Sequence, residues 1–159
     1  MYEEAVEQLE EIEFPWLVFK IKDNLYTVNS KKITSIVMLP EKVTKVPNVP
    51  KHMLGLIHLR GNVIPLIDLR MLFGMKSIKE EYEESDIHSK EMVIVFEDDN
   101  SFMGILVDEV LSVENITQFE DSEEIRKMYK EGYVKGVAKG QKNSEVLLIL
   151  DEEKIMTTN

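Results

Sequence analysis

The stretch Gly55–Gly74, GLIHLRGNVIPLIDLRMLFG, constrains the fold of this chain more than any other part of the sequence. Two apolar runs flank a polar turn, which is the pattern of a β-hairpin. Gly61 and Asn62 tolerate the positive φ angles that a two-residue turn needs. After Asp68 the apolar residues change to a spacing of i, i+3 and i+4, which predicts a short helix that ends near Gly74.

Short apolar runs separated by turn residues continue along the rest of the chain. Beside the hairpin, the predicted strands are Trp16–Ile21, Leu25–Val28, a stretch from Ile33 that ends before Pro40, Met92–Phe96, Phe102–Val107, a stretch from Val110 to Ile116, Val134–Ala138 and Val146–Leu150. Short helices are predicted over Met1–Glu13, from Asp121 to Lys130 and over Glu152–Met156. About ten short strands with few helices predict an all-β barrel or sandwich.

A weak internal repeat relates the two halves of the chain. The segment Val28–Ile36 aligns without gaps on Ile105–Val113, and glycine-led strands follow at Gly55 and Gly136. The repeat predicts two similar small β units that pack through their apolar faces, with a groove of approximate two-fold symmetry at the junction. The charged segment Lys76–Glu91 is the least structured part by composition, so we expect the two units to divide near residues 76–91.

Composition limits the class of protein and its partners. At 159 residues the chain has the length of one compact domain. The net charge is −11, from 30 acidic and 19 basic residues, and such an excess opposes binding to phosphate backbones. No apolar run reaches the ~20 residues that cross a bilayer, and the acidic N-terminus lacks the features of a signal peptide. We expect a cytoplasmic protein with no nucleic-acid partner and no direct membrane insertion.

The sequence does not indicate an enzyme, a metal site or a cofactor site. The absence of cysteine excludes disulfides and thiolate ligands, and the three histidines lack metal-ligand spacing. Neither a nucleophile elbow nor a Walker A loop is present. Asp98 and Asp99 follow an apolar strand, as the phosphate acceptor of a receiver domain does. They lie between two strands only a few residues apart, so we interpret them as part of a hairpin turn.

Gly55–Gly74 resembles the signature of the CheW family, the coupling proteins of bacterial chemotaxis. The residues that match this signature are Gly55, Leu59, Arg60, Gly61, Pro65, Asp68 and Leu69. The segment Gly104–Val113 resembles a second family motif, G-x-x-V-D-x-V. The resemblance extends over about residues 14–156, so residues 1–159 are expected to form a single CheW-like domain.

The resemblance implies both a fold and a function. The fold is two five-stranded SH3-like β-barrels packed with pseudo-two-fold symmetry, with a few short helices that include N- and C-terminal ones. The function is that of a stand-alone, non-enzymatic adaptor. It would bind the cytoplasmic tip of methyl-accepting chemoreceptors and the regulatory domain of the histidine kinase CheA, and so be recruited to membrane-associated receptor arrays. It would need no cofactor.

The resemblance also points to partner-binding residues. The candidates for a receptor groove or a kinase interface are Arg60, Gly61, Ile33, Ser35, Ile36, Val110 and Val113. Two positions depart from the family pattern. His58 replaces the usual asparagine before L-R-G, and Ser35 replaces an acidic residue that in family members can pair with the signature arginine. Ser35 cannot form an ion pair, so we expect Arg60 to have another acceptor or to lie free.

Two alternative functions stay open at this point. One is an auxiliary CheW-like scaffold of a chemosensory pathway that does not control motility. The other is a small-barrel nucleic-acid-binding module, since SH3-like and OB-like barrels often serve that role. The charge of −11 and the absence of a basic stripe with aromatic residues disfavour the second.

Overall fold

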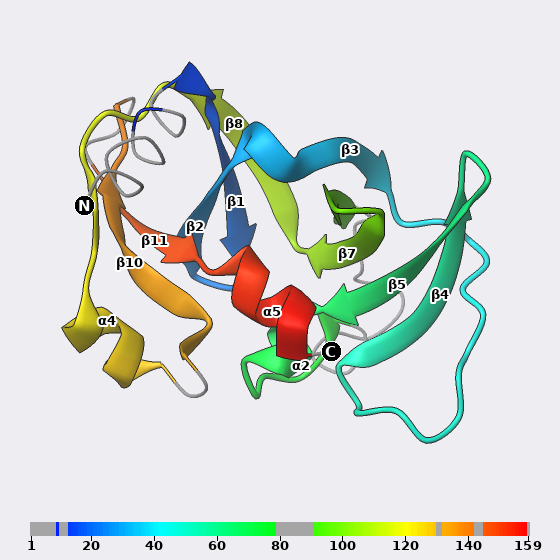
Figure 1. Ribbon diagram of the computed structural model, residues 1–159. Coiled ribbons are helices and arrows are strands. Elements are labelled where there is room, and N and C mark those ends of the chain that lie inside the picture. The colour runs from blue at the N-terminus through cyan, green and yellow to red at the C-terminus, as the bar shows by residue number, and fades with distance from the viewer. Residues whose placement is uncertain (1–8, 10–12, 79–90, 130–131, 142–144, 159) are drawn as a thin grey trace. The chain divides into compact units, whose positions relative to one another are not determined.

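A computed structural model gives the fold of the chain (Figure 1). It describes residues 9, 13–78, 91–129, 132–141 and 145–158. The chain forms two compact units. Unit 1 comprises Met1–Lys31 with Val110–Asn159, and unit 2 comprises Lys32–Glu109.

Unit 1 is built on a six-stranded sheet with the strand order β8-β1-β2-β11-β10-β9. Its strands are β1 (Trp16–Ile21), β2 (Asn24–Asn29), β8 (Glu109–Glu114), β9 (Phe119–Asp121), β10 (Val134–Lys139) and β11 (Val146–Leu150). The helices are the 3-10 turn η1 (Ser30–Lys32), α4 (Glu123–Met128) and α5 (Glu152–Thr158). The predicted C-terminal helix is confirmed. Of the helix predicted over Met1–Glu13, only Leu9 and Glu13 lie among the described residues.

Unit 2 is built on a five-stranded sheet with the strand order β3-β6-β7-β5-β4. Its strands are β3 (Ile33–Met38), β4 (Met53–Leu59), β5 (Asn62–Asp68), β6 (Met92–Asp98) and β7 (Ser101–Val107). The short helix α2 (Leu69–Leu72) follows β5 directly. Asp68 caps it, because its side chain accepts a hydrogen bond from the Met71 backbone N–H, and so the predicted change from strand to helix after Asp68 is confirmed.

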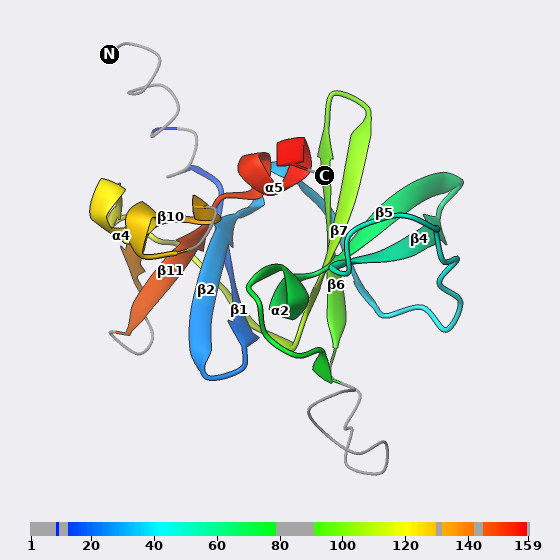
Figure 2. The same ribbon diagram turned by 90° about the horizontal axis from the view of Figure 1, so that it is seen from below.

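The two sheets share the order of five strands, with each strand from one half of the chain replaced by its counterpart from the other half, and the unit 1 sheet has β9 as a sixth strand. The order β3-β6-β7-β5-β4 in unit 2 corresponds to β8-β1-β2-β11-β10 in unit 1. In each sheet, a hairpin from one half of the chain lies between strands of the other half. Its second strand pairs in parallel with a strand of that other half, β7 with β5 (Figure 2) and β2 with β11 (Figure 1). The result is the expected all-β fold of two related units.

This exchange of hairpins moves the boundary away from the position expected from composition. The expected division near residues 76–91 falls inside unit 2, whereas the units separate after Lys31 and after Glu109. The physical reason is strand pairing. Strands before and after the charged segment, β3 with β6 and β5 with β7, are joined by backbone hydrogen bonds in one sheet.

Each unit has its own apolar core, built from the inward-facing residues of its strands. The unit 1 cluster contains Trp16, Val18, Ile116, Ala138, Leu147 and Ile149, and the unit 2 cluster contains Ile57, Ile64, Leu66, Val93, Val95 and Leu106. In unit 1 the Trp16 and Phe119 rings pack with centroids 5.0 Å apart. Burial of such side chains contributes about 1.5–3 kcal/mol each and holds the sheets in shape.

Two glycines mark equivalent close approaches of the backbone. A Cβ atom on Gly55 of β4 would overlap the carbonyl oxygen of Thr44, and one on Gly136 of β10 would overlap that of Glu120. Each glycine also lies at a register shift in its strand pairing. The glycine-led strands of the sequence repeat are therefore equivalent. In each, the glycine allows a neighbouring segment, at Thr44 or at Glu120, to approach the strand backbone closely.

The two aspartates at the end of β6 form a hairpin turn. Asp98 pairs with Ser101, and the two residues between them, Asp99 and Asn100, have φ angles of 48° and 66°. This is the geometry of a two-residue hairpin loop. The interpretation of this segment as a turn is confirmed.

Candidate partner-binding surfaces

The Arg60–Gly61 turn joins β4 to β5 and presents an arginine to solvent. Leu59 pairs with Asn62, so Arg60 and Gly61 are the two loop residues. Their φ angles are 50° and 83°, and a type I′ turn requires positive φ at both central residues. The predicted turn is confirmed, but the positive angles fall one residue earlier than expected. Asn62 is the first residue of β5 instead.

Arg60 adopts a backbone conformation that its residue type disfavours. A left-handed φ costs an L-residue with a side chain roughly 1–2 kcal/mol, which glycine avoids and asparagine tolerates better. The side chain of Arg60 is exposed. Among the residues that the structure describes, its guanidinium has no ion-pair partner. Arg60 therefore does not stabilise its own turn.

β3 is an edge strand of the unit 2 sheet, and its two faces differ. Ile33, Ser35 and Val37 are half-buried, whereas the residues between them are exposed. Ile36 is 39% exposed and Met38 is 66% exposed. Strand geometry thus separates the predicted residues, with Ile33 and Ser35 on the covered face and Ile36 on the open face.

β8 is an edge strand of the unit 1 sheet and has the same alternation. Val110 is half-buried, whereas Leu111 is 44% exposed and Val113 is 56% exposed. The predicted residues Val110 and Val113 are three positions apart, and this spacing puts two residues on opposite faces of a strand. Of the predicted pair, Val113 lies on the open face together with Leu111.

Sequence reasoning missed two of the four exposed aliphatic residues on these edge strands. Met38 and Leu111 were not predicted, because the candidates were taken from the apolar positions that align between the two halves of the repeat. The signal that identifies them is the alternation with period two, counted outward from Ile36 and Val113. We call the Ile36 and Met38 face the β3 edge patch, and the Leu111 and Val113 face the β8 edge patch.

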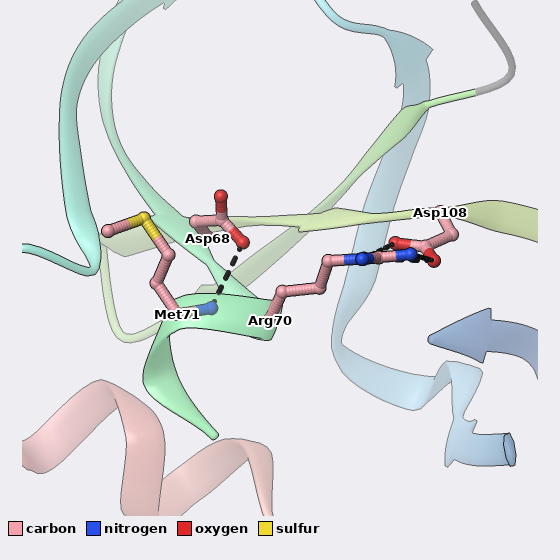
Figure 3. A network of polar contacts seen from close by, with 4 residues as sticks. All are labelled: Asp68, Arg70, Met71 and Asp108. Atoms are coloured by element: carbon pink, nitrogen blue, oxygen red, sulfur yellow. Dashed lines mark hydrogen bonds and ion pairs between the residues drawn. The ribbon is translucent and has the colours of Figure 1, made fainter. Parts of the chain in front are cut away.

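A buried polar network lies between the end of β5 and the end of β7 (Figure 3). Arg70 is 4% exposed. Its Nε and Nη2 atoms donate hydrogen bonds to the Asp108 carboxylate at 2.8 Å and 2.5 Å. Asp68 accepts from the Met71 N–H at 3.3 Å. Burial raises the pKa of the Asp68 carboxyl, because desolvation outweighs the hydrogen bonds from the Met71 and Arg70 N–H groups.

The described residues offer little for other kinds of site. Within the described ranges, no group of three or more His, Cys, Asp or Glu side chains is placed to hold a metal ion. No helix in the described part of the chain has the length and apolar character needed to cross a membrane. Among the described residues, the exposed features that include predicted partner-binding residues are the Arg60 turn and the two edge patches.

Comparison with known proteins identifies the family. Residues 15–159 match the family described as the CheW-like domain. The chain belongs to the CheW-like domain family. The match covers the hairpin signature, both sheets and the C-terminal helix.

Relatives of this CheW-like domain match most of its length. The chemotaxis protein CheW of Klebsiella aerogenes is 28% identical over 145 residues, which are 90% of this chain and 81% of the relative. The chemotaxis protein CheW of Helicobacter pylori is 29% identical over 138 residues, covering 87% and 78%. The crystal structure of the scaffolding protein TtCheW from Thermoanaerobacter tengcongensis has a TM-score of 0.70 at 23% identity, covering 87% of this chain and 88% of that one. The fold is that of CheW.

Proposed function

We propose that this CheW-like domain is a non-enzymatic adaptor that holds chemoreceptors and the histidine kinase CheA together in a cytoplasmic array. Membership of the family and relatives named as chemotaxis proteins support this proposal. The observation on which it rests in this chain is the exposed Arg60, which keeps a side chain at a left-handed backbone position where glycine or asparagine would fold more easily. A side chain that opposes its own turn and stabilises nothing around it is explained by a contact outside the domain.

Arg60 has the chemistry for such a contact. A guanidinium donates in a planar fork to carboxylates, and it also binds the carbonyl oxygens at the C-terminus of a helix. We propose that Arg60, presented by Gly61, binds an acidic side chain or a helix end of the receptor tip. The two-residue turn already fixes the backbone that carries the side chain, so the ordering cost on binding is that of the Arg60 side-chain rotamers.

The two edge patches supply apolar surface for the same partners. Ile36 and Met38 project from β3 and Leu111 and Val113 from β8, in each case two residues apart on the solvent face of an edge strand. We propose that these patches take apolar side chains of the receptor tip and of the kinase regulatory domain. Ile33, Ser35 and Val110 then act from the covered faces as supports rather than contacts.

A co-sedimentation assay tests the adaptor function directly. Receptor-containing membranes are mixed with CheA, with and without this protein, and kinase retention and autophosphorylation are measured. The expected result is retention of CheA that depends on the added protein, with a change in autophosphorylation. If CheA stays in the supernatant and its activity is unchanged, the adaptor function is wrong. An auxiliary scaffold of another chemosensory pathway would instead retain the kinase of that pathway.

Variants then separate the Arg60 contact from the stability of the fold. Arg60→Ala keeps a Cβ at the same φ, so the free energy of unfolding should stay nearly unchanged while receptor coupling falls about tenfold, equivalent to ~1.4 kcal/mol. Arg60→Gly should be at least as stable as the wild type and equally defective in coupling. Full coupling by Arg60→Gly would show that the arginine has no role in binding.

A second set of variants tests the edge patches. Met38→Glu and Val113→Glu place a charge on an exposed apolar position and should reduce retention of a partner without unfolding the domain. Val146→Glu is a matched control, because Val146 is 67% exposed at the start of β11 and belongs to neither patch. Equal loss of binding in all three variants would point to a general effect of charge rather than to the patches.

A further inference from the structure

The inserted hairpins of the two units end at equivalent positions. In unit 2, Leu66 of β5 pairs with Gly104 of β7. Arg70 lies four residues after Leu66, and Asp108 lies four residues after Gly104. These two residues form the buried ion pair. In unit 1, Ile149 of β11 pairs in parallel with Thr27 of β2.

In unit 1, the residue four positions after Ile149 is Glu153, and the residue four positions after Thr27 is Lys31. Asp151 accepts a hydrogen bond from the Lys154 N–H, just as Asp68 accepts one from the Met71 N–H, so α5 and α2 begin in the same way. Glu153 therefore occupies the position of Arg70, and Lys31 occupies that of Asp108. The charges are reversed in both places.

Solvent exposure differs between the two positions, and this sets the strength expected of each contact. Arg70 is buried, whereas Glu153 is exposed and Lys31 is half-buried. Lys31 and Glu153 each make a hydrogen bond, ion pair or electrostatic interaction. An ion pair between partly exposed side chains contributes little to stability by itself. Such an ion pair has a larger effect on which hairpin joins which sheet, because a wrong hairpin would bring like charges together, and like charges in a buried position repel strongly.

We propose that Lys31 and Glu153 form the charge-reversed counterpart of the Arg70–Asp108 pair, and that this reversal assigns each hairpin to its sheet. The alternative is a chain in which each half keeps its own hairpin. The β1–β2 hairpin would then lie beside β5 and bring Lys31 against Arg70. The β6–β7 hairpin would lie beside β11 and bring Asp108 against Glu153. Both contacts join like charges, and Arg70 would be buried without a carboxylate.

The charge reversal matters because the two sheets are alike enough for a hairpin to join the wrong one. The two sheets share the order of five strands, and the equivalent strands pair in parallel with the same register, so strand order and register do not by themselves distinguish the two hairpins. The self-contained alternative joins strands that are closer in sequence, and contacts of low sequence separation form faster. The charge reversal acts against the alternative that forms first.

A double-mutant cycle tests whether the pair exists. Lys31→Ala and Glu153→Ala should each raise the unfolding equilibrium constant about two- to fivefold, and the double variant should raise it no more than one of them. Multiplicative effects in the double variant, as for two independent surface residues, would overturn the pairing.

A second experiment tests the assignment of hairpins. The variant Lys31→Asp with Glu153→Arg keeps an ion pair in unit 1 but gives both units the same polarity, so the wrong arrangement is no longer repelled. We expect its urea midpoint to match that of the wild type. We expect refolding after dilution from urea, followed by double-jump stopped-flow, to show at least a twofold loss of the fast phase that leads to native protein.

The matched control exchanges the same residue types elsewhere in unit 1. Lys20→Asp with Glu145→Arg alters two exposed residues that lie away from the hairpin ends, and it should refold like the wild type. If the variant at Lys31 and Glu153 also refolds with the wild-type amplitude, the charge reversal does not assign the hairpins. If both variants lose the fast phase equally, the effect comes from surface charge in general and the proposal is equally overturned.

Discussion

Arg70, which is almost completely buried, donates three hydrogen bonds from Nε and Nη2 to the Asp108 carboxylate, 38 positions further along the sequence. The pair joins the helix that follows β5 to the end of β7, where the chain leaves unit 2. An ion pair of this kind is costly to break from one side, because the remaining charge stays buried without a partner.

Removal of one partner should destabilise the protein strongly. We expect Asp108→Ala to lower the free energy of unfolding by about 3 kcal/mol, measured by urea denaturation. The control is Lys32→Ala, which removes the 3.2 Å pair with Asp98, whose side chains are 19% and 44% exposed. That variant should lose only about 0–1 kcal/mol. Equal losses in the two variants would contradict the role assigned to burial.

Stability should decrease as pH rises through the titration of Asp68. Burial raises the pKa of this carboxyl in the folded state, so between its unfolded and folded pKa values the native protein binds more protons than the unfolded chain. The free energy of unfolding contributed by Asp68 is therefore highest in acid and is lost as the pH rises through the folded pKa. Burial raises the pKa of Glu152 as well, which acts in the same direction.

Asp68→Asn isolates this contribution, since asparagine also caps helices but does not titrate. The variant should gain stability relative to the wild type as the pH is raised from about 4 to 7, in urea titrations at each pH. A difference that is constant with pH would show that Asp68 does not titrate with a raised pKa.

Gly136 should tolerate no side chain. A Cβ would overlap the Glu120 carbonyl oxygen on β9, so Gly136→Ala should lower the free energy of unfolding by about 1–3 kcal/mol. Gly140→Ala is the matched control, because its nearest neighbours stand at 3.6 Å, an ordinary van der Waals distance. Thermal denaturation of the two variants should place Gly136→Ala well below Gly140→Ala. Similar midpoints would contradict the close approach of β9.

The Arg60 turn should become more stable when the arginine is replaced by a residue that favours positive φ. Arg60→Asn is expected to raise the free energy of unfolding by about 1 kcal/mol. Arg60→Ala, which keeps the strain, should change it by less than about 0.5 kcal/mol. A loss of stability in Arg60→Asn would mean that the arginine side chain supports the fold after all.

Local features were predictable from sequence because each depends on neighbouring residues. The hairpin at Gly61, the helix start at Asp68 and the turn after Asp98 follow from turn chemistry and capping, which act over a few positions. The resemblance to CheW depended on the same short signature. The turn residues were misplaced by one position, because the pairing of Leu59 with Asn62 decides which two residues form the loop.

The predicted partner-binding residues differ in their exposure to solvent. Ile36, Val113 and Arg60 are exposed, whereas Ile33, Ser35 and Val110 are half-buried. Residues three apart cannot share one face of a strand, so the spacing taken from the repeat selected both faces.

By itself, the sequence determined the family, the two-fold repeat and the described strands other than β9 (Phe119–Asp121), because periodicity, turn residues and glycine positions depend on residues close together in the chain. Only the tertiary structure decided that each half contributes its hairpin to the sheet of the other half, which moved the unit boundaries to Lys31 and Glu109. It also brought Arg70 to Asp108. Both outcomes depend on parallel pairing between strands far apart in the chain, whose register no local pattern specifies.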